Sequence, residues 1–254
     1  MTTVYWAVDN SLTLIGRGVR MSARNVEALL MAVMLPVLLM LLFVYVFGGA
    51  ISGGTGYVNY VVPGIVILCA GFGASTTAVS VTRDMVEGMI DRIRSMPVVS
   101  SAVLTGHVVA SVARNMVAMA IVVGVALLIG WRPSAGVADW FAAVGFLALF
   151  MVSLSWLAAW LGLVVKSVDA AGGSTFAITF LPYVSSAFVP VDTLPSWLRG
   201  VAEHQPITPI VETTRGLLMG TPIGDSWWIA LIWFGGITLV AMTGATVLFR
   251  RRTA

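Results

Sequence analysis

Charged side chains gather in one short segment between two long apolar runs. Of the 14 basic and 11 acidic residues in the 254-residue chain, six lie between positions 83 and 94. Methionine and isoleucine recur there at helical spacing with the charges on the other side, which predicts a short amphipathic helix that presents charge to a soluble partner. A solvated loop that merely joins two spans is the alternative. The residues expected to contact the partner are Arg83, Asp84, Glu87, Gly88, Asp91, Arg92 and Arg94.

A second group of polar side chains lies inside an apolar run. Arg114 is the one basic residue well inside a predicted span, and His107, Ser111 and Asn115 share its side of the helix. A guanidinium within a membrane is costly unless it reaches water or finds a partner. His107 and Arg114 are therefore predicted to be either helix anchors or part of a transport pathway.

A third candidate site lies in residues 192–225, which are too apolar for a solvated loop. Two short helices are predicted there, one opened by Pro195 and one that follows Pro209. Glu212 and Arg215 lie three positions apart on the second helix, so we expect them to pair or to lie at the membrane interface and to control an outer exit. Two interfacial helices that only cap the bundle are the alternative.

The composition predicts an integral membrane protein. With 59% hydrophobic and 10% charged residues, the chain carries more apolar surface than one soluble core can bury. The single cysteine, Cys69, excludes an intrachain disulfide, and the two histidines, His107 and His204, lie too far apart to predict a metal site. The acidic residues lie outside the apolar runs or at their edges, which disfavours an ion-coupled carrier, and no filter sequence suggests a channel.

Six apolar runs are long enough to cross a hydrocarbon core of about 30 Å, which takes about 20 helical residues. They predict an all-α, polytopic protein with a single transmembrane domain over residues 1–254. The predicted spans are Leu29–Phe47, Tyr60–Val81, Val109–Ile129, Trp140–Val165, Ala170–Val191 and Trp227–Phe249. In order, the predicted parts are 1–28, an amphipathic helix; 29–82, spans one and two; 83–97, the charged segment; 102–191, spans three to five; 192–225, the outer helices; 226–249, span six; and 250–254, a basic tail.

The basic residues predict the orientation of these spans. Ten of them fall on one side and three on the other, which places both termini in the cytoplasm. No cleavable signal peptide is predicted, because the first apolar run begins only near Leu29. Apolar residues on one face of residues 1–28, with arginines beside them, predict a helix in the cytoplasmic headgroup layer. A polar leader with cytoplasmic arginines is the alternative.

Several short motifs follow one another between about Pro36 and Arg252. They are Tyr60-Val61-Val62-Pro63-Gly64; Asp84, Gly88, Asp91, Arg92, Arg94 and Pro97; Ala187-Phe188-Val189-Pro190; Pro195-Ser196-Trp197-Leu198; and Pro206, Arg215 and Gly220. In this order the chain resembles the permease subunits of type-2 ATP-binding-cassette exporters, in particular the daunorubicin-resistance-like branch. Two positions depart from that pattern: Gln205 stands where the family usually has Asn, and Ile93 stands where an aromatic residue is common.

The resemblance implies a role for each polar segment. The resemblance implies that the charged segment (83–97) is a coupling helix that docks on an ATPase and that residues 1–28 form a connecting helix. It also implies that residues 192–225 form extracellular re-entrant helices. The whole chain is then expected to be a multi-pass protein of the bacterial plasma membrane. The only lysine, Lys166, follows Val165, so the chain has no phosphate-binding loop and is not expected to be an enzyme. ATP and Mg are expected on a separate ATPase in two copies. The other expected partners are a second copy of this chain or a paralogous permease and membrane lipids, with no nucleic acid.

Three functions stay open from the sequence. The first is an exporter subunit that moves amphipathic drugs or lipid-like molecules out of the cytoplasm or inner leaflet. The second is a subunit of the same architecture for cell-envelope polysaccharide or lipid-linked precursors, and the third is a membrane assembly factor without transport. Because no carboxylate lies well inside a span, permanently cationic substrates are disfavoured. Phe, Trp and Met side chains of the first, second and fifth spans are expected to line the pathway.

Overall fold

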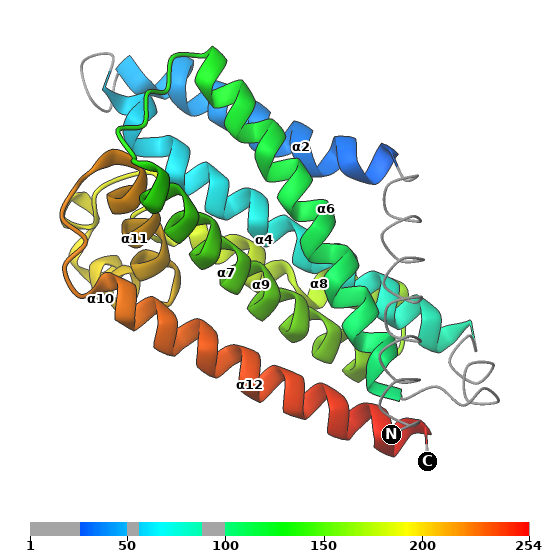
Figure 1. Ribbon diagram of the computed structural model, residues 1–254. Helices are drawn as coiled ribbons and strands as arrows, with labels where there is room; N and C mark the ends of the chain where they lie inside the picture. Colours follow the sequence, from blue (N-terminus) through cyan, green and yellow to red (C-terminus); the bar gives the residue numbers. More distant parts are fainter. Residues whose placement is uncertain (1–25, 50–55, 88–99, 254) are drawn as a thin grey trace.

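Four long helices form most of the computed structural model, which describes residues 26–49, 56–87 and 100–253 (Figure 1). Each is long and apolar enough to cross a membrane, and together they cover the predicted second, third, fourth and sixth spans to within one residue. These helices are α4 (Tyr57–Val86), α6 (Ser100–Leu128), α7 (Val137–Val164) and α12 (Ser226–Thr253). They extend beyond the predicted spans because a helix continues into the aqueous layers, where hydropathy no longer marks it. The all-α class is confirmed for the described residues.

The first predicted span forms a shorter apolar helix. It consists of α2 (Val26–Leu41) and a π-helical turn, η1 (Leu42–Phe47). Pro36 lies inside α2 and cannot donate a backbone hydrogen bond. The apolar stretch of the described helix, Ala32–Phe47, is shorter than the about 20 residues that a straight crossing takes. A membrane crossing by this segment therefore stays a prediction.

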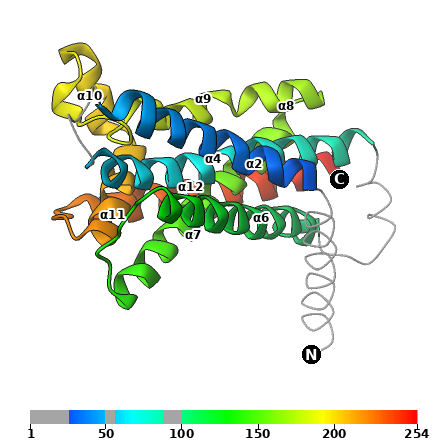
Figure 2. The same ribbon diagram turned by 90° about the horizontal axis from the view of Figure 1, so that it is seen from above.

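The fifth predicted span differs from the prediction of one transmembrane helix. The chain there forms three short helices, α8 (Val168–Ser174), α9 (Phe176–Phe180) and η2 (Leu181–Val184). Gly172 and Gly173 weaken the helix, the Thr175 hydroxyl donates to the Gly172 carbonyl at 2.9 Å, and Pro182 removes a backbone donor. All three short helices contact α4, so this part of the chain follows α4 as a broken run (Figure 2).

The apolar connection after the broken run contains the two expected short helices. It has a single turn, η3 (Val191–Thr193), then α10 (Ser196–His204) and α11 (Ile207–Met219). Helix α11 begins before Pro209 rather than after it, and it ends at Gly220, which has a left-handed φ of 68°. Most of α11 is buried against α4, α7 and α12, whereas in α10 only Ala202 is buried. The two helices therefore differ: α11 lies within the bundle and α10 on its outside.

Helix α4 lies at the centre of the bundle and α12 at its edge. In the most apolar stretch of α4, 72% of the residues are buried, against 17% in α12. Figure 2 shows α8 and α9 along one side of α4 and α6 and α7 along the other. At one end lie α10 and α11; at the other, α4 and α12 end and α6 begins (Figure 1). We call these the α11 end and the basic end, since Arg83, Arg250 and Arg251 lie at the latter.

Candidate functional site

Arg215 of α11 has its guanidinium group inside the α11 end of the bundle, where the residue is only 9% exposed. Its Nε donates to the Tyr60 carbonyl at 3.2 Å, and its Nη2 donates to the Ser186 carbonyl at 2.6 Å. The guanidinium carbon also lies 3.9 Å from the centroid of the Tyr60 ring. Burial lowers the pKa of the Arg215 guanidinium, and the neighbouring Tyr60 and Glu212 act in the opposite direction. A buried cation needs acceptors, so these contacts hold α11 to α4 and to the turn at Ser186.

The turn that Arg215 contacts, residues 186–188, packs against the first two turns of α4. The Tyr57 hydroxyl donates to the Phe188 carbonyl at 2.7 Å, and the Tyr60 hydroxyl donates to the Ser186 carbonyl at 3.0 Å. A Cβ atom on Gly64 would lie 2.4 Å from the Ala187 carbonyl oxygen, so only glycine allows this approach. We call Tyr57, Tyr60, Gly64, the turn 186–188 and Arg215 the arginine anchor. It joins the end of the broken fifth run to α4 and α11.

Most of the arginine anchor was not predicted from the sequence. Arg215 was identified, but as a residue that pairs with Glu212 or lies at the membrane interface. The Glu212 carboxylate instead accepts a hydrogen bond from the Ser226 hydroxyl at 3.1 Å, at the start of α12. Tyr60 and Gly64 stood in one of the motifs that carried the family resemblance and Ala187 in another, and these motifs were the available signal that the residues lie together. Tyr57 lay outside those motifs.

All four residues of the predicted polar face of α6 lie against α4. The His107 Nε2 atom lies 2.9 Å from Asp84 Oδ2, and its Nδ1 atom lies 3.4 Å from the Ser80 hydroxyl. Deeper in the bundle the Ser111 hydroxyl accepts a hydrogen bond from Thr77 at 2.7 Å. We call this contact between α4 and α6 the polar seam. Its members are Gly73, Thr76, Thr77, Ser80 and Asp84 of α4 and His107, Ser111, Arg114 and Asn115 of α6.

Arg114 lies near the middle of α6 and joins the polar seam. Its Nη2 donates to the Thr76 hydroxyl on α4. About one turn of α4 nearer the α11 end, a Cβ atom on Gly73 would lie 1.7 Å from the Asn115 amide nitrogen. The absence of a side chain at Gly73 therefore leaves room for that amide. Arg114 thus contacts a second helix of the same chain.

The charged segment is only partly covered by the described residues. Asp84 was expected to contact a partner, but its side chain is 22% exposed and is directed to His107 of α6. Arg83 and Glu87 are exposed at the basic end. The remaining residues predicted to contact the partner, Gly88, Asp91, Arg92 and Arg94, lie outside the described residues.

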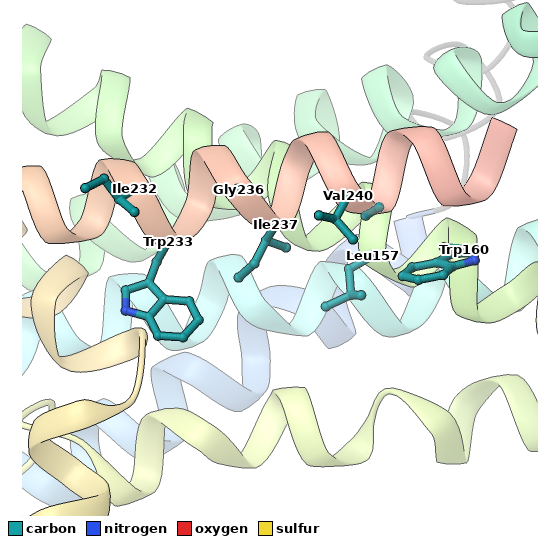
Figure 3. Close-up of a pocket in the computed structure, with 8 residues that line it drawn as sticks. Leu157, Trp160, Ile232, Trp233, Gly236, Ile237 and Val240 are labelled. Atoms are coloured by element: carbon teal, nitrogen blue, oxygen red, sulfur yellow. The ribbon is translucent and has the colours of Figure 1, made fainter. Parts of the chain in front are cut away.

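An apolar groove runs between α7 and α12, with a volume of about 420 Å³ (Figure 3). The Trp233 and Trp160 indoles lie at opposite ends of it, with Ile237 and Leu157 between them. Gly236 and Val240 also line it. We call it the α7–α12 groove. The sequence had predicted an apolar pathway along the first, second and fifth spans, whereas this groove lies on the fourth and sixth.

Comparisons with known proteins identify the family of this chain. Residues 10–219 match the ABC-2 type transporter family. The daunorubicin resistance ABC transporter permease protein DrrB1 of Streptomyces coeruleorubidus is 29% identical over 245 residues, which are 96% of this chain and 84% of that protein. The probable doxorubicin resistance ABC transporter permease protein DrrC of Mycobacterium tuberculosis H37Rv is 22% identical over 232 residues, which are 90% of this chain and 84% of that protein. This chain therefore belongs to the ABC-2 type transporter family and is a membrane permease.

Proposed function

We propose that this permease is one half of an ATP-driven exporter for neutral or zwitterionic amphipaths, such as drugs or lipid-like molecules. The observation that carries the proposal is the similarity over 96% of the chain to a permease whose name gives daunorubicin resistance. ATP and Mg would bind a separate ATPase, because Lys166 is the only lysine and belongs to no phosphate-binding loop. Two permeases and two ATPases would form the complete exporter.

The charges of the four long helices support a substrate without a permanent positive charge. Their acidic residues are Asp84, in the last turn of α4, and Asp139, in the first turn of α7. Asp84 contacts His107, and the Asp139 carboxylate accepts a hydrogen bond from the Gly136 backbone at 2.9 Å. Both carboxylates are thus engaged at helix ends. A cation in the hydrocarbon layer would need a carboxylate or an aromatic cage in place of its water.

We propose that the charged segment, 83–97, docks on the ATPase and transmits its movement to the bundle. It connects α4 to α6, and the polar seam joins these two helices from the Asp84–His107 contact to the middle of α6. A displacement of the segment would therefore move α4 and α6 together. The exposed Arg83 and Glu87 are available for contacts with a soluble partner.

At the α11 end, Glu212 and Arg215 would control the exit by holding α11 in place. Arg215 ties α11 to α4, and Glu212 ties it to α12. Residues 192–225 would then face the outside as re-entrant helices, and residues 1–28 would form the connecting helix at the cytoplasmic surface. We also propose that the chain crosses the membrane six times and that both termini lie in the cytoplasm.

A transport assay tests the proposed substrate class. Inverted vesicles that contain the permease with its co-purified ATPase would be given a series of compounds matched in apolar area but differing in charge. We expect ATP-dependent uptake of the neutral and zwitterionic members. A strong preference for the cationic members would contradict the proposal.

A second experiment tests the coupling role of the charged segment. Asp91→Ala and Gly88→Trp should leave membrane insertion intact and weaken co-purification of the ATPase. Asp91→Ala removes one member of a proposed ion pair, which typically costs about 2 to 5 kcal/mol when the pair is desolvated, and Gly88→Trp adds a bulky side chain at the proposed contact. Asp225→Ala, at the exposed opposite end, is the matched control and should retain the ATPase. Normal co-purification and export by both segment variants would show that the segment is only a loop.

A further inference from the structure

The α7–α12 groove has the size of a ligand site and fixed walls. Its volume of about 420 Å³ falls in the range of sites for drug-sized molecules, roughly 300 to 1,000 Å³. Close to it, Ser153 Oγ of α7 lies 2.7 Å from the Phe234 carbonyl oxygen and 2.6 Å from Thr238 Oγ1 of α12. These contacts are polar and buried, so they hold the two helices together beside the groove.

Gly236 keeps the groove open without any packing reason of its own. An added Cβ at Gly236 would meet nothing within 4 Å, and the residue does not have a positive φ. Glycine in the middle of a helix lowers stability relative to alanine, and no close approach by a described residue compensates for it here. The consequence of the missing side chain is space in the groove.

The lining residues indicate the chemistry of an occupant. Those described at the groove carry no charge, and the Trp160 and Trp233 rings lie at its two ends (Figure 3). Ile232, Trp233 and Val240 are exposed on α12, so the groove opens away from the core of the bundle. A neutral molecule suits this lining, because a charge would lose its water without a counter-charge.

We propose that the α7–α12 groove binds the ring system of a neutral amphipath that reaches the permease laterally through the bilayer. The inference rests on the proposed export function and names where the substrate first docks. Indole rings stack on other aromatic rings, and a rigid ring system loses less conformational freedom on binding than a flexible acyl chain does. These two arguments favour a ring-bearing molecule over ordinary lipid.

Two adjacent glycines provide a matched pair of variants for the test. Gly235 and Gly236 both have open space around an added Cβ, but only Gly236 lines the groove. Adjacent helical residues point about 100° apart, so Gly236→Leu fills the groove and Gly235→Leu does not. Both substitutions change helix propensity in the same way. Gly236→Ala is a smaller filling that serves if the leucine variant does not accumulate in the membrane.

Binding is measured with benzophenone, a neutral two-ring photo-crosslinker, in phosphatidylcholine vesicles that contain the permease and its ATPase. We expect wild-type labelling on peptides that carry Leu157, Trp160 and the α12 side of the groove. Gly236→Leu should reduce this labelling about ten-fold, the effect of losing about two methylene groups of apolar contact. Gly235→Leu should label like the wild type. Equal labelling of both variants would overturn the proposal.

A parallel arm uses phosphatidylcholine with benzophenone at the end of an acyl chain. If this lipid labels the groove and free benzophenone does not, the groove holds acyl chains only and the proposal is wrong. Export is measured separately with N-phenyl-1-naphthylamine, an uncharged fluorescent probe, and should be slowed by Gly236→Leu relative to Gly235→Leu. Groove labelling with no ATP-dependent export by the wild type would contradict the export function but not the binding site, so the two failures can be told apart.

Discussion

At the scale of single residues, Arg215 connects three segments that lie far apart in the sequence. Its carbonyl acceptors belong to Tyr60, 155 positions away, and Ser186, 29 positions away. A hydrogen bond from a charged donor contributes about 1.5 to 3 kcal/mol. The position of α11 should therefore depend on this one side chain.

Replacement of Arg215 should destabilise the permease much more than replacement of another arginine at the same end. Arg215→Ala is expected to cost about 2 to 4 kcal/mol, because two buried carbonyls lose their charged donor. Arg215→Lys should recover only part of this, since lysine cannot reproduce the two-point fork or the stacking on Tyr60. The control is Arg199→Ala, which removes an exposed side chain that donates to the Asp192 carbonyl. The rate at which a thiol dye labels the buried Cys69 on heating measures unfolding; equal rates for the two alanine variants would contradict the anchor.

Asp84 and His107 form the contact between α4 and α6 at the basic end of the polar seam. Their distance of 2.9 Å predicts that substitutions at the two positions are not additive. Asp84→Ala, His107→Ala and the double variant should give an interaction free energy of about 0.5 to 3 kcal/mol in the same Cys69 assay. If the two effects simply add, the contact makes no net contribution and Asp84 is instead available to a partner.

At the scale of the helices, α4 organises the bundle through close approaches on different faces. Gly64 admits the turn at Ala187 on one face, and Gly73 admits Asn115 of α6 on another. Helix α7 also comes close, since the Thr82 hydroxyl donates to the Gly162 carbonyl at 2.8 Å. Small residues and hydroxyls allow such approaches in a membrane helix, where lipid competes with apolar packing.

Two glycines of α4 should respond in opposite ways to a single added methyl group. At Gly64 the new Cβ would lie 2.4 Å from a backbone oxygen, so Gly64→Ala should destabilise the bundle by about 1 to 3 kcal/mol. At Gly71 an added Cβ meets nothing within 4 Å, so Gly71→Ala should be neutral or stabilising by up to about 1 kcal/mol. Cys69 labelling and membrane abundance would be compared, and a stable Gly64→Ala protein would contradict the close approach at Ala187.

At the scale of the whole molecule, the two ends of the bundle differ in chemistry. Among the described residues, the basic end carries Arg83 and the arginines at the end of α12, whereas the α11 end carries α10 and the arginine anchor. Basic residues collect on the cytoplasmic side of membrane proteins. The proposed ATPase contact therefore lies at the basic end, and the proposed exit lies at the α11 end.

Single cysteines in a Cys69→Ser background test this orientation. Cysteines introduced at Ser11, Ser95 and Thr253 should be protected from a membrane-impermeant thiol reagent in intact cells, because these positions are predicted to be cytoplasmic. A cysteine at Ser196, which is exposed at the start of α10, should react. Permeabilised cells are the control, since all four positions should then become accessible. Labelling of the Ser95 position from outside would contradict the six-span topology.

The sequence by itself determined the features that depend on local composition. Hydropathy and length identified the four long helices, because a membrane helix satisfies its own backbone hydrogen bonds and needs only a continuous apolar run. The motifs in their order predicted the family that the comparisons confirmed. Glu212 and Arg215 were identified as candidates from their charges in an apolar segment.

Only the tertiary structure decided which distant groups meet. Hydropathy did not predict the break in the fifth run, because Gly172, Gly173 and Pro182 interrupt the helix while the run stays apolar. Arg215 binds carbonyls from two other segments, because a buried guanidinium takes whichever acceptors the packed helices present, and these are not encoded by spacing along the chain. The α7–α12 groove also depends on tertiary packing. Its two walls belong to helices that are separated in the chain by α8 to α11, and its volume depends on how these two helices pack.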